Sequence, residues 1–373
     1  MPSAASQRSA RPSSSPGSPE QVVVTDSLDE HAGAWDALAA AAPLPSPFLR
    51  SWWLAHMPAV QPAYVLVFGA DGLLGGLALD RKQIAPVPVW RHLGSALVPD
   101  HLDLIARPAR EAEVVDALRR WLRRPGSRLL ELDGLAEGAS LLRALPRPRT
   151  IRSDDVAPYF RLPSADLEEY LRGRPGRLRS SVERPRKRLQ DKLGVIHRSV
   201  PAHDIDRGLH KFRVLHLERW GPDAPLLRAW PAFSAAAAAG IRCGELRLHE
   251  LVAPACETSP EQVIAMDALF VIGNRVSIYA GGRSTAPAWR GAGTLLMWAE
   301  MAALVTHDGA REFDFLRGDE PYKHDWADSA RSVLVARTAH GPRGLAALAR
   351  REGPRLLRNR LRPLARRMGR AGR

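Results

Sequence analysis

The stretch REFDFLRGDEPYKHDWA (residues 311–327) decides the interpretation of the chain, because it opens as a strand and ends in a cluster of charges. Asp314 stands between Phe313 and Phe315, where a core strand would carry Val or Ile. On a strand, the two Phe side chains face one side and Asp314 the other. A carboxylate on a sheet face is costly to bury unless it is paired. The stretch therefore indicates either an ion-paired turn or a reactive site.

A glycine-rich loop, AWRGAGTLL (residues 288–296), lies just upstream. Arg290, Gly291 and Gly293 precede an apolar segment, for which we expect a helix from about Thr294 to Asp308. Such a turn lets backbone N–H groups approach an anion, and the helix dipole favours negative charge there. A pyrophosphate is the natural ligand, and an ordinary glycine turn with a surface arginine is the alternative. Neither the Walker A nor the G-x-G-x-x-G pattern occurs.

The rest of the chain predicts two α/β units with mixed sheets. Residues 244–253, 261–273 and 275–282 read as consecutive antiparallel strands, with a turn at Gly273 and Asn274. The first 150 residues contain a hairpin around Ala70-Asp71-Gly72, followed by further helices and strands. Both halves end in a helix and a strand, which is consistent with a duplicated fold. The predicted parts are a disordered leader (1–19), two domains (20–155 and 156–340) and a basic Arg-rich tail (341–373).

The order of strand, Arg-Gly-x-Gly loop, helix and strand resembles the coenzyme A-binding core of the GNAT acyltransferase superfamily. The resemblance is closer to its CelD-like or FemAB-related acetyltransferase branch and spans roughly residues 21–340. The matching residues are Gly293, Leu295, Leu296, Phe313, Asp314, Phe315, Leu316, Arg317, Gly318, Glu320, Tyr322, Lys323 and Trp326. Leu295 matches this branch but departs from the general GNAT loop pattern, whose last position is small, and Ala292 stands where the branch often has Pro.

The resemblance implies tandem GNAT-like domains, the second of which carries the acyl-CoA core. It implies acetyl-CoA or another acyl-CoA as co-substrate and no metal. The pyrophosphate would lie over the backbone of the glycine-rich loop. The predicted cofactor-binding residues are Arg290, Gly291, Ala292, Gly293 and Thr294.

Acyl transfer to an amine needs a proton acceptor for the amine and stabilisation of the departing thiolate, and acid–base assistance contributes about 10²- to 10⁴-fold. Asp314 or Glu320 is the candidate base and Tyr322 the candidate donor. Lys323 is the candidate charge stabiliser for the oxyanion or an anionic substrate. The alternative is a structural network in which Asp314, Arg317 and Lys323 brace the turn.

An acceptor site is predicted from the basic segment 172–192 and the helix that follows it. The candidate residues are Arg184, Lys187, Arg188, Arg213, Trp220 and Arg317. Arg213, His216 and Trp220 have spacings of three and four, which place them on one helix face. A solvated helix face is the alternative for both segments. The resemblance implies an amine acceptor, either a small molecule such as an amino sugar or a cell-envelope or polysaccharide precursor.

The net charge of +14 is concentrated in two segments. Residues 172–192 carry +7 and residues 341–373 carry +10, so the rest of the chain is near neutral. The tail would suit an anionic membrane surface, non-specific nucleic acid binding, or no dedicated partner. No specific nucleic acid is expected, because no recognised binding motif occurs. The absence of a long apolar run and the presence of only two cysteines predict a cytoplasmic protein, and the tail adds peripheral contact with the inner membrane face as an alternative.

Two competing functions remain open from the sequence. One is a FemAB-type transferase that uses aminoacyl-tRNA, whose tRNA the basic segments would bind. The other is a non-enzymatic basic protein that binds nucleic acid, which would leave the charged cluster of residues 311–327 unexplained.

Overall fold

The computed structural model describes residues 21–164, 166–257 and 259–353. The predicted leader and residues 354–373 of the predicted tail lie outside this part of the chain. The first half contains β1 (Gln21–Thr25), η1 (Asp29–His31), α1 (Ala32–Ala40), η2 (Pro47–Leu49), α2 (Ser51–Leu54), β2 (Pro62–Gly69), β3 (Gly72–Ile84), β4 (Val87–His92), η3 (Ser95–Leu97), β5 (Ile105–Ala106), η4 (Pro108–Arg110), α3 (Glu111–Leu122), β6 (Arg128–Ala136), α4 (Leu141–Ala144) and β7 (Arg149–Arg161).

The second half is richer in helix. It contains α5 (Leu167–Arg172), α6 (Gly176–Pro185), η5 (Arg186–Lys192), β8 (Ile196–Ser199), η6 (Ala202–Asp204), α7 (Ile205–Trp220), α8 (Pro225–Arg228), α9 (Trp230–Arg242), β9 (Leu246–Ala253), β10 (Gln262–Ile272), β11 (Arg275–Arg283), η7 (Pro287–Trp289), α10 (Ala292–His307), β12 (Glu312–Asp314), α11 (Pro321–Trp326) and β13 (Ser329–His340). Residues 342–353 form a further helix.

One mixed sheet runs through both halves in the order β1-β2-β3-β4-β6-β13-β7-β12-β11-β10-β9-β8. In the first half, β1 to β4 are antiparallel, and α3 leads to β6, which is parallel to β4. In the second half, β8 to β11 are antiparallel, and α10 leads to β12, which is parallel to β11. The same plan therefore occurs twice, and the predicted duplicated α/β fold with a mixed sheet is confirmed.

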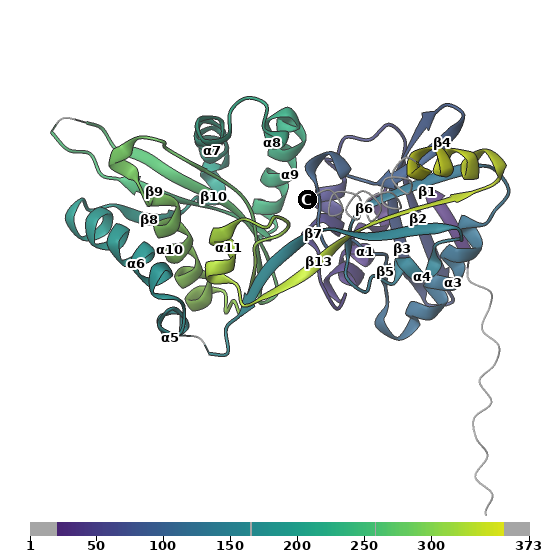
Figure 1. Ribbon diagram of the computed structural model, residues 1–373, viewed down its shortest axis with the longest axis horizontal. Coiled ribbons are helices and arrows are strands. Elements are labelled where there is room, and N and C mark those ends of the chain that lie inside the picture. Colours follow the sequence, from purple (N-terminus) through teal and green to yellow (C-terminus); the bar gives the residue numbers. More distant parts are fainter. Residues whose placement is uncertain (1–20, 165, 258, 354–373) are drawn as a thin grey trace, which may run out of the picture.

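The two halves exchange their last strands. The final strand of the first half, β7, pairs with β12, and the final strand of the second half, β13, pairs with β6. The two strands also pair with each other, and they run side by side between the lobes in Figure 1. The expected domain boundary between residues 155 and 156 lies inside β7.

Helices cover both faces of the second half of the sheet. On one face, α7 and α9 pack with α1 and α2 in a core that includes Trp53, Phe212 and Phe270 and therefore joins the halves. On the other face, α10 packs against the sheet through residues such as Leu296 and Met301. The predicted strands β9, β10 and β11 and the predicted hairpin of β2 and β3 are confirmed.

The first residues of the predicted basic tail are folded onto the first half. Leu348, in the helix of residues 342–353, is buried against Val87, Leu129 and Ala339. Arg337 of β13 also pairs with Glu352 of this helix. None of the helices in the described part of the chain combines the length and apolar character that a membrane crossing requires.

Candidate functional site

The sheet opens where β11 and β12 separate. These parallel strands pair only from Arg275 to Ser277 of β11, while β11 continues to Arg283 along β10. The β10–β11 register also shifts between Ala268 and Leu269, which marks a bulge beside the opening. The second half of β11 therefore has one edge that β12 does not cover, and a ligand can use its backbone groups.

The N-terminus of α10 lies at this opening. Gly291 takes the N-cap position with φ 88°, and no side chain caps the helix. A Cβ at Gly293 would lie 3.0 Å from Nη1 of Arg283, so this glycine lets an arginine approach the first turn. Free backbone N–H groups and a nearby guanidinium form a positive site suited to an anion.

The five predicted cofactor-binding residues lie together at this terminus. Arg290 is exposed, Gly291, Gly293 and Thr294 are half-buried, and Ala292 is buried at the start of the helix. The helix begins at Ala292, two residues before the expected Thr294. Together they form an exposed loop in which a cation precedes a helix N-terminus.

The basic segment packs against the same loop. Arg188 of η5 donates to the carbonyls of Ala288, at 2.6 Å, and Arg290. A Cβ at Gly291 would lie 2.5 Å from Pro185, so only glycine allows this close contact. Arg188 therefore orients the loop.

Two further cations of the basic segment are exposed beside these contacts. Arg184 and Lys187 have no hydrogen bond or ion pair with any residue that the structure describes. Their side chains are therefore available to a ligand.

Helix α7 borders the opening on the other side. His216 and Trp220 both bond to the carbonyl of Gly281, at 3.0 and 2.9 Å. Burial lowers the pKa of His216, so a neutral ring donates to that carbonyl. The exposed ring of Trp220 lies beneath the guanidinium of Arg219. Arg213, the third predicted residue of this face, instead lies over Trp230.

Asp314 is the centre of a buried ion-pair network. Its side chain is fully buried, and Oδ2 lies 2.7 Å from Arg275, 2.8 Å from Arg331 and 3.1 Å from Nε2 of His101. Burial alone would raise the pKa of Asp314, but His101, Arg275 and Arg331 hold it well below its ordinary value. A carboxylate that is so firmly ionised and enclosed is a weak proton acceptor, so the geometry does not favour Asp314 as the base.

Its partners differ from those that the sequence suggested. The sequence suggested Arg317 and Lys323, which follow Asp314 closely in the chain, yet the groups that pair with Asp314 come from β11, β13 and the first half. The structural alternative, a network that braces the turn, describes Asp314 better than the catalytic prediction.

Arg317 and Lys323 are also held by protein groups. Arg317 bonds to Asp100 at 2.5 Å and to Asp133 at 3.3 Å, which ties the turn to the first half. Lys323 is 5% exposed and donates to the carbonyl of Arg317 at 2.6 Å. It also pairs with Glu320 at 2.8 Å. Neither cation is therefore open to a substrate in this arrangement, which disfavours their predicted roles.

Tyr322 remains available. It is 49% exposed, and its ring meets Phe315 edge-on with centroids 6.4 Å apart. Partial burial, helped by the charges of Glu320 and Asp267, raises the pKa of Tyr322 to about 12. The phenol therefore keeps its proton at neutral pH and can donate it, which suits the predicted role at a departing thiolate. Glu320 is exposed, and only Lys323 pairs with it among the described residues.

The sequence analysis did not identify two further acids as candidate site residues. Asp267 lies in the apolar strand VIAMDALFVI (263–272), and Glu300 lies in the apolar helix LLMWAEMAAL (295–304). Burial raises the pKa of both carboxyl groups, and Asp267 raises that of Glu300 further. The signal was the one that drew attention to Asp314, an acid within an apolar segment.

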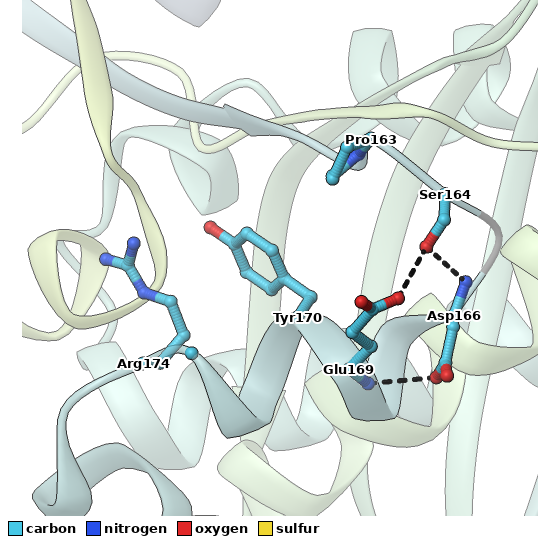
Figure 2. A pocket seen from close by; sticks show the side chains of 7 residues that line it. Pro163, Ser164, Asp166, Glu169, Tyr170 and Arg174 are labelled. Carbon is cyan, nitrogen blue, oxygen red and sulfur yellow. Dashed lines mark hydrogen bonds between the residues drawn. The ribbon is translucent and has the colours of Figure 1, made fainter.

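A shallow pocket of about 210 Å³ lies along α5. Figure 2 shows Ser164, Asp166 and Glu169 linked by hydrogen bonds at one end of it, with Tyr170 and Arg174 at the other. The Tyr170 hydroxyl donates to the carbonyl of Trp326, and Arg174 donates to that of Ala327. These bonds anchor α11, so the pocket is part of the support of that helix. No group of three or more potential metal ligands occurs among the described residues.

Comparisons with known proteins show what the sequence and the fold of this chain are similar to. Residues 176–324 match the family model of the acetyltransferase (GNAT) domain. The structure of FemX superposes with a TM-score of 0.60 at 11% identity, over 82% of this chain and 95% of that one. A conserved protein of unknown function from Bacteroides thetaiotaomicron VPI-5482 superposes with a TM-score of 0.55 at 8% identity, over 86% and 99%.

A tandem GNAT protein from the clavulanic acid biosynthesis pathway superposes with a TM-score of 0.49 at 16% identity, over 87% and 99%. No curated protein matches the sequence. The first two structures show that the fold is shared across nearly the whole of those chains.

Proposed function

Because the chain contains a GNAT-type acetyltransferase domain, we propose that it transfers an acyl group, most simply acetyl, from coenzyme A to an amine. The cofactor would lie in the opening between β11 and β12. Its pyrophosphate would meet the N–H groups of Gly291, Ala292 and Gly293, with Arg290 beside them. Tyr322 would donate its proton to the departing thiolate.

The uncapped start of α10 carries this proposal. Its first N–H groups have no side-chain acceptor, and Arg290 beside them is exposed. A helix N-terminus concentrates about half a positive charge, to which the guanidinium adds a full one. A bound pyrophosphate would satisfy both.

The acceptor enters this proposal through the exposed cations near the same loop. Arg184 and Lys187 are exposed on the segment that Arg188 anchors, and Trp220 offers an exposed aromatic face. An amine carried on an anionic small molecule or glycan precursor would be recognised by such a surface. We place the reaction in the cytoplasm, with the Arg-rich tail as a contact for an anionic membrane surface.

The test is a titration of acetyl-CoA against the full chain and two charge-reversed variants. Wild type should bind with an affinity in the micromolar to millimolar range typical of enzyme substrates. Arg290→Glu should lose binding, whereas Arg242→Glu, a matched change at an exposed position at the end of α9, should keep it. Equal binding by both variants would contradict the cofactor site.

Aminoacyl-tRNA in place of acetyl-CoA tests the competing donor. Transfer of the aminoacyl group, with no binding of acetyl-CoA, would replace the proposed donor. Binding of nucleic acid alone, lost in a chain that ends at residue 353, would favour the non-enzymatic alternative.

A further inference from the structure

The layer between α10 and the sheet is apolar except for a small group of ionisable side chains. Asp267 of β10 lies between Ala265 and Leu269, which pack against α10. Glu300 lies on the buried face of α10, one turn from Leu296 and Leu304. Charged groups in such a layer are costly unless they are paired.

Glu300 has an unusual environment. It is 1% exposed, and neither of its carboxyl oxygens accepts a hydrogen bond from any residue that the structure describes. The carboxyl of Asp267 interacts electrostatically with it and raises the pKa of Glu300. Two ionised carboxylates cannot hydrogen-bond to each other, whereas a carboxylic acid donates to a carboxylate. The two carboxyl groups can therefore hydrogen-bond to each other only when one of them carries a proton.

Asp267 reaches the opening of the sheet from this layer. It is partly exposed, and it stands directly opposite Gly281 in the β10–β11 register. A Cβ at Gly281 would collide with Oδ1 of Asp267, so the carboxyl lies over the backbone of β11 beyond its separation from β12. The carbonyl of Gly281 also accepts the bonds from His216 and Trp220 that border the opening.

Other ionisable groups surround Asp267 on each neighbouring element. Tyr322 of α11 and Arg283 of β11 both interact electrostatically with it. His249 of β9 is its opposite partner in the register, and burial lowers the pKa of His249 to about 3, so that ring is neutral. The site therefore combines a proton acceptor, a protonated partner and the phenol proposed to act on the thiolate.

We propose that Asp267 accepts the proton of the acceptor amine during acyl transfer, and that Glu300 is a positioning residue that stays protonated and donates to Asp267. This assignment rests on the proposed function. The amine nitrogen forms a bond to the acyl carbon, its proton passes to Asp267, and the carbon–sulfur bond breaks. Tyr322 protonates the sulfur, and the proton on Asp267 then returns to the phenolate. A neutral amine and an acyl-CoA thus give an amide and a free thiol.

The first measurement is thiol release from acetyl-CoA, with water, glucosamine, putrescine or lysine as acceptor. Asp267→Asn should lower the rate by about 10²- to 10⁴-fold, the usual range for a lost acid–base group, while the affinity for acetyl-CoA stays near wild type. Asp308→Asn is the matched control, because it removes an acid that pairs with Arg247 at the far end of α10. Thermal unfolding verifies that each variant is folded.

The second measurement separates a positioning role of Glu300 from a packing role. Glu300→Gln keeps a donor to Asp267 and should keep a pH profile close to wild type. Glu300→Leu removes the donor, so the ionised form of Asp267 loses stabilisation and the rise of activity should move to higher pH. Infrared spectra of the unliganded protein should show a carboxylic acid band that Glu300→Gln removes. A shift to lower pH in Glu300→Leu would mean that Glu300 is ionised and would overturn the proposal.

The remaining outcomes separate this inference from the proposed function. Wild-type rates in Asp267→Asn, or the loss of rate in Glu320→Gln instead, would overturn the assignment and leave the acyl-CoA site standing. Wild type that binds acetyl-CoA but releases no thiol with any acceptor also counts against Asp267 as the base. Failure to bind acetyl-CoA would remove the proposed function itself, whatever the infrared band shows.

Discussion

The two halves of the molecule share a plan but differ at the start of their crossover helices. In the first half, α3 opens with Glu111 and Glu113, and Arg143 and Arg110 pair with these acids. In the second half, α10 opens with glycines and has no acid in its first turn, and neither helix has a capping side chain. A helix N-terminus that carries its own carboxylates repels an anion, whereas an open one attracts it. The same topology therefore gives one supporting half and one half suited to an anionic ligand.

In both halves, ion pairs brace the strand that follows the crossover helix. Glu131 of β6 pairs with Arg91 of β4 and Arg351, at 2.7 and 2.8 Å. Glu312 of β12 pairs with Arg331 of β13 and lies 3.3 Å from Arg275 of β11. The brace is shared and so belongs to the fold, whereas we attribute the difference at the helix N-terminus to the proposed function. Asp314 adds to the second brace, because His101 reaches it from the first half.

The largest expected effect comes from removing the deeper acid. Asp314→Ala should lower the free energy of unfolding by about 3 kcal/mol, because it leaves buried cations without their partner. Glu131→Ala should cost less, since that carboxylate is 12% exposed and water can reach its arginines. Denaturant titration of both variants measures the difference. A larger loss of unfolding free energy in Glu131→Ala than in Asp314→Ala would show that the ion pairs of the first half contribute more to stability than those of the second.

The ion pairs of Asp314 also make the stability of the protein depend on pH. The folded pKa of Asp314 is depressed, so its stabilisation is fully present above its unfolded pKa of about 3.9 and is lost as the pH falls towards the folded value. The deficit of Asp314→Ala should therefore be constant near neutral pH and shrink in acid. A deficit that grows as the pH falls would contradict the ion-pair assignment.

Much of the structure of the second half could be predicted from the sequence. What could not be predicted has a physical cause. Glycines and apolar periodicity act locally, so the loop at Arg290, the helix after it and the strands of the second half were predicted correctly. Ion pairs depend on which strands become neighbours. The exchange of β7 and β13 brought Arg331 to Asp314, a pairing that distance along the chain does not indicate.

The two acids that interrupt apolar strands also show that tertiary contacts cannot be read from the sequence. Asp314 and Asp267 both interrupt apolar strands, but only Asp314 lies in the stretch that resembles the acetyltransferase branch, so it alone was predicted as a candidate base. Their difference lies in tertiary partners, since cations surround Asp314 while Asp267 meets another carboxyl group. The sequence therefore identified the right kind of residue, and tertiary contacts decide which one could accept a proton.

A third prediction concerns a variant in which α10 carries an acid in its first turn, as α3 does. Gly293→Glu places a carboxylate at the first turn, as in α3, next to Arg283. Binding of acetyl-CoA should fall by about 10²-fold or more, because a like charge against a bound anion costs several kcal/mol. Gly293→Gln has a similar size without the charge and should lose less. Equal losses in the two variants, measured by calorimetric titration, would assign the effect to bulk and not to charge.

The smallest effect is expected from the reverse exchange. Replacing both Glu111 and Glu113 by Gln removes the acids from α3 and should lower the stability only slightly, because each acid interacts favourably with the positive end of the helix but is partly exposed to water. We expect no second acetyl-CoA site, because α3 follows the Pro108 turn and no glycine lets a ligand approach its first N–H groups. The stoichiometry of acetyl-CoA binding should therefore stay at one for each chain. A rise to two would mean that charge alone separates the halves, and that the glycines of the second loop are dispensable for holding the anion.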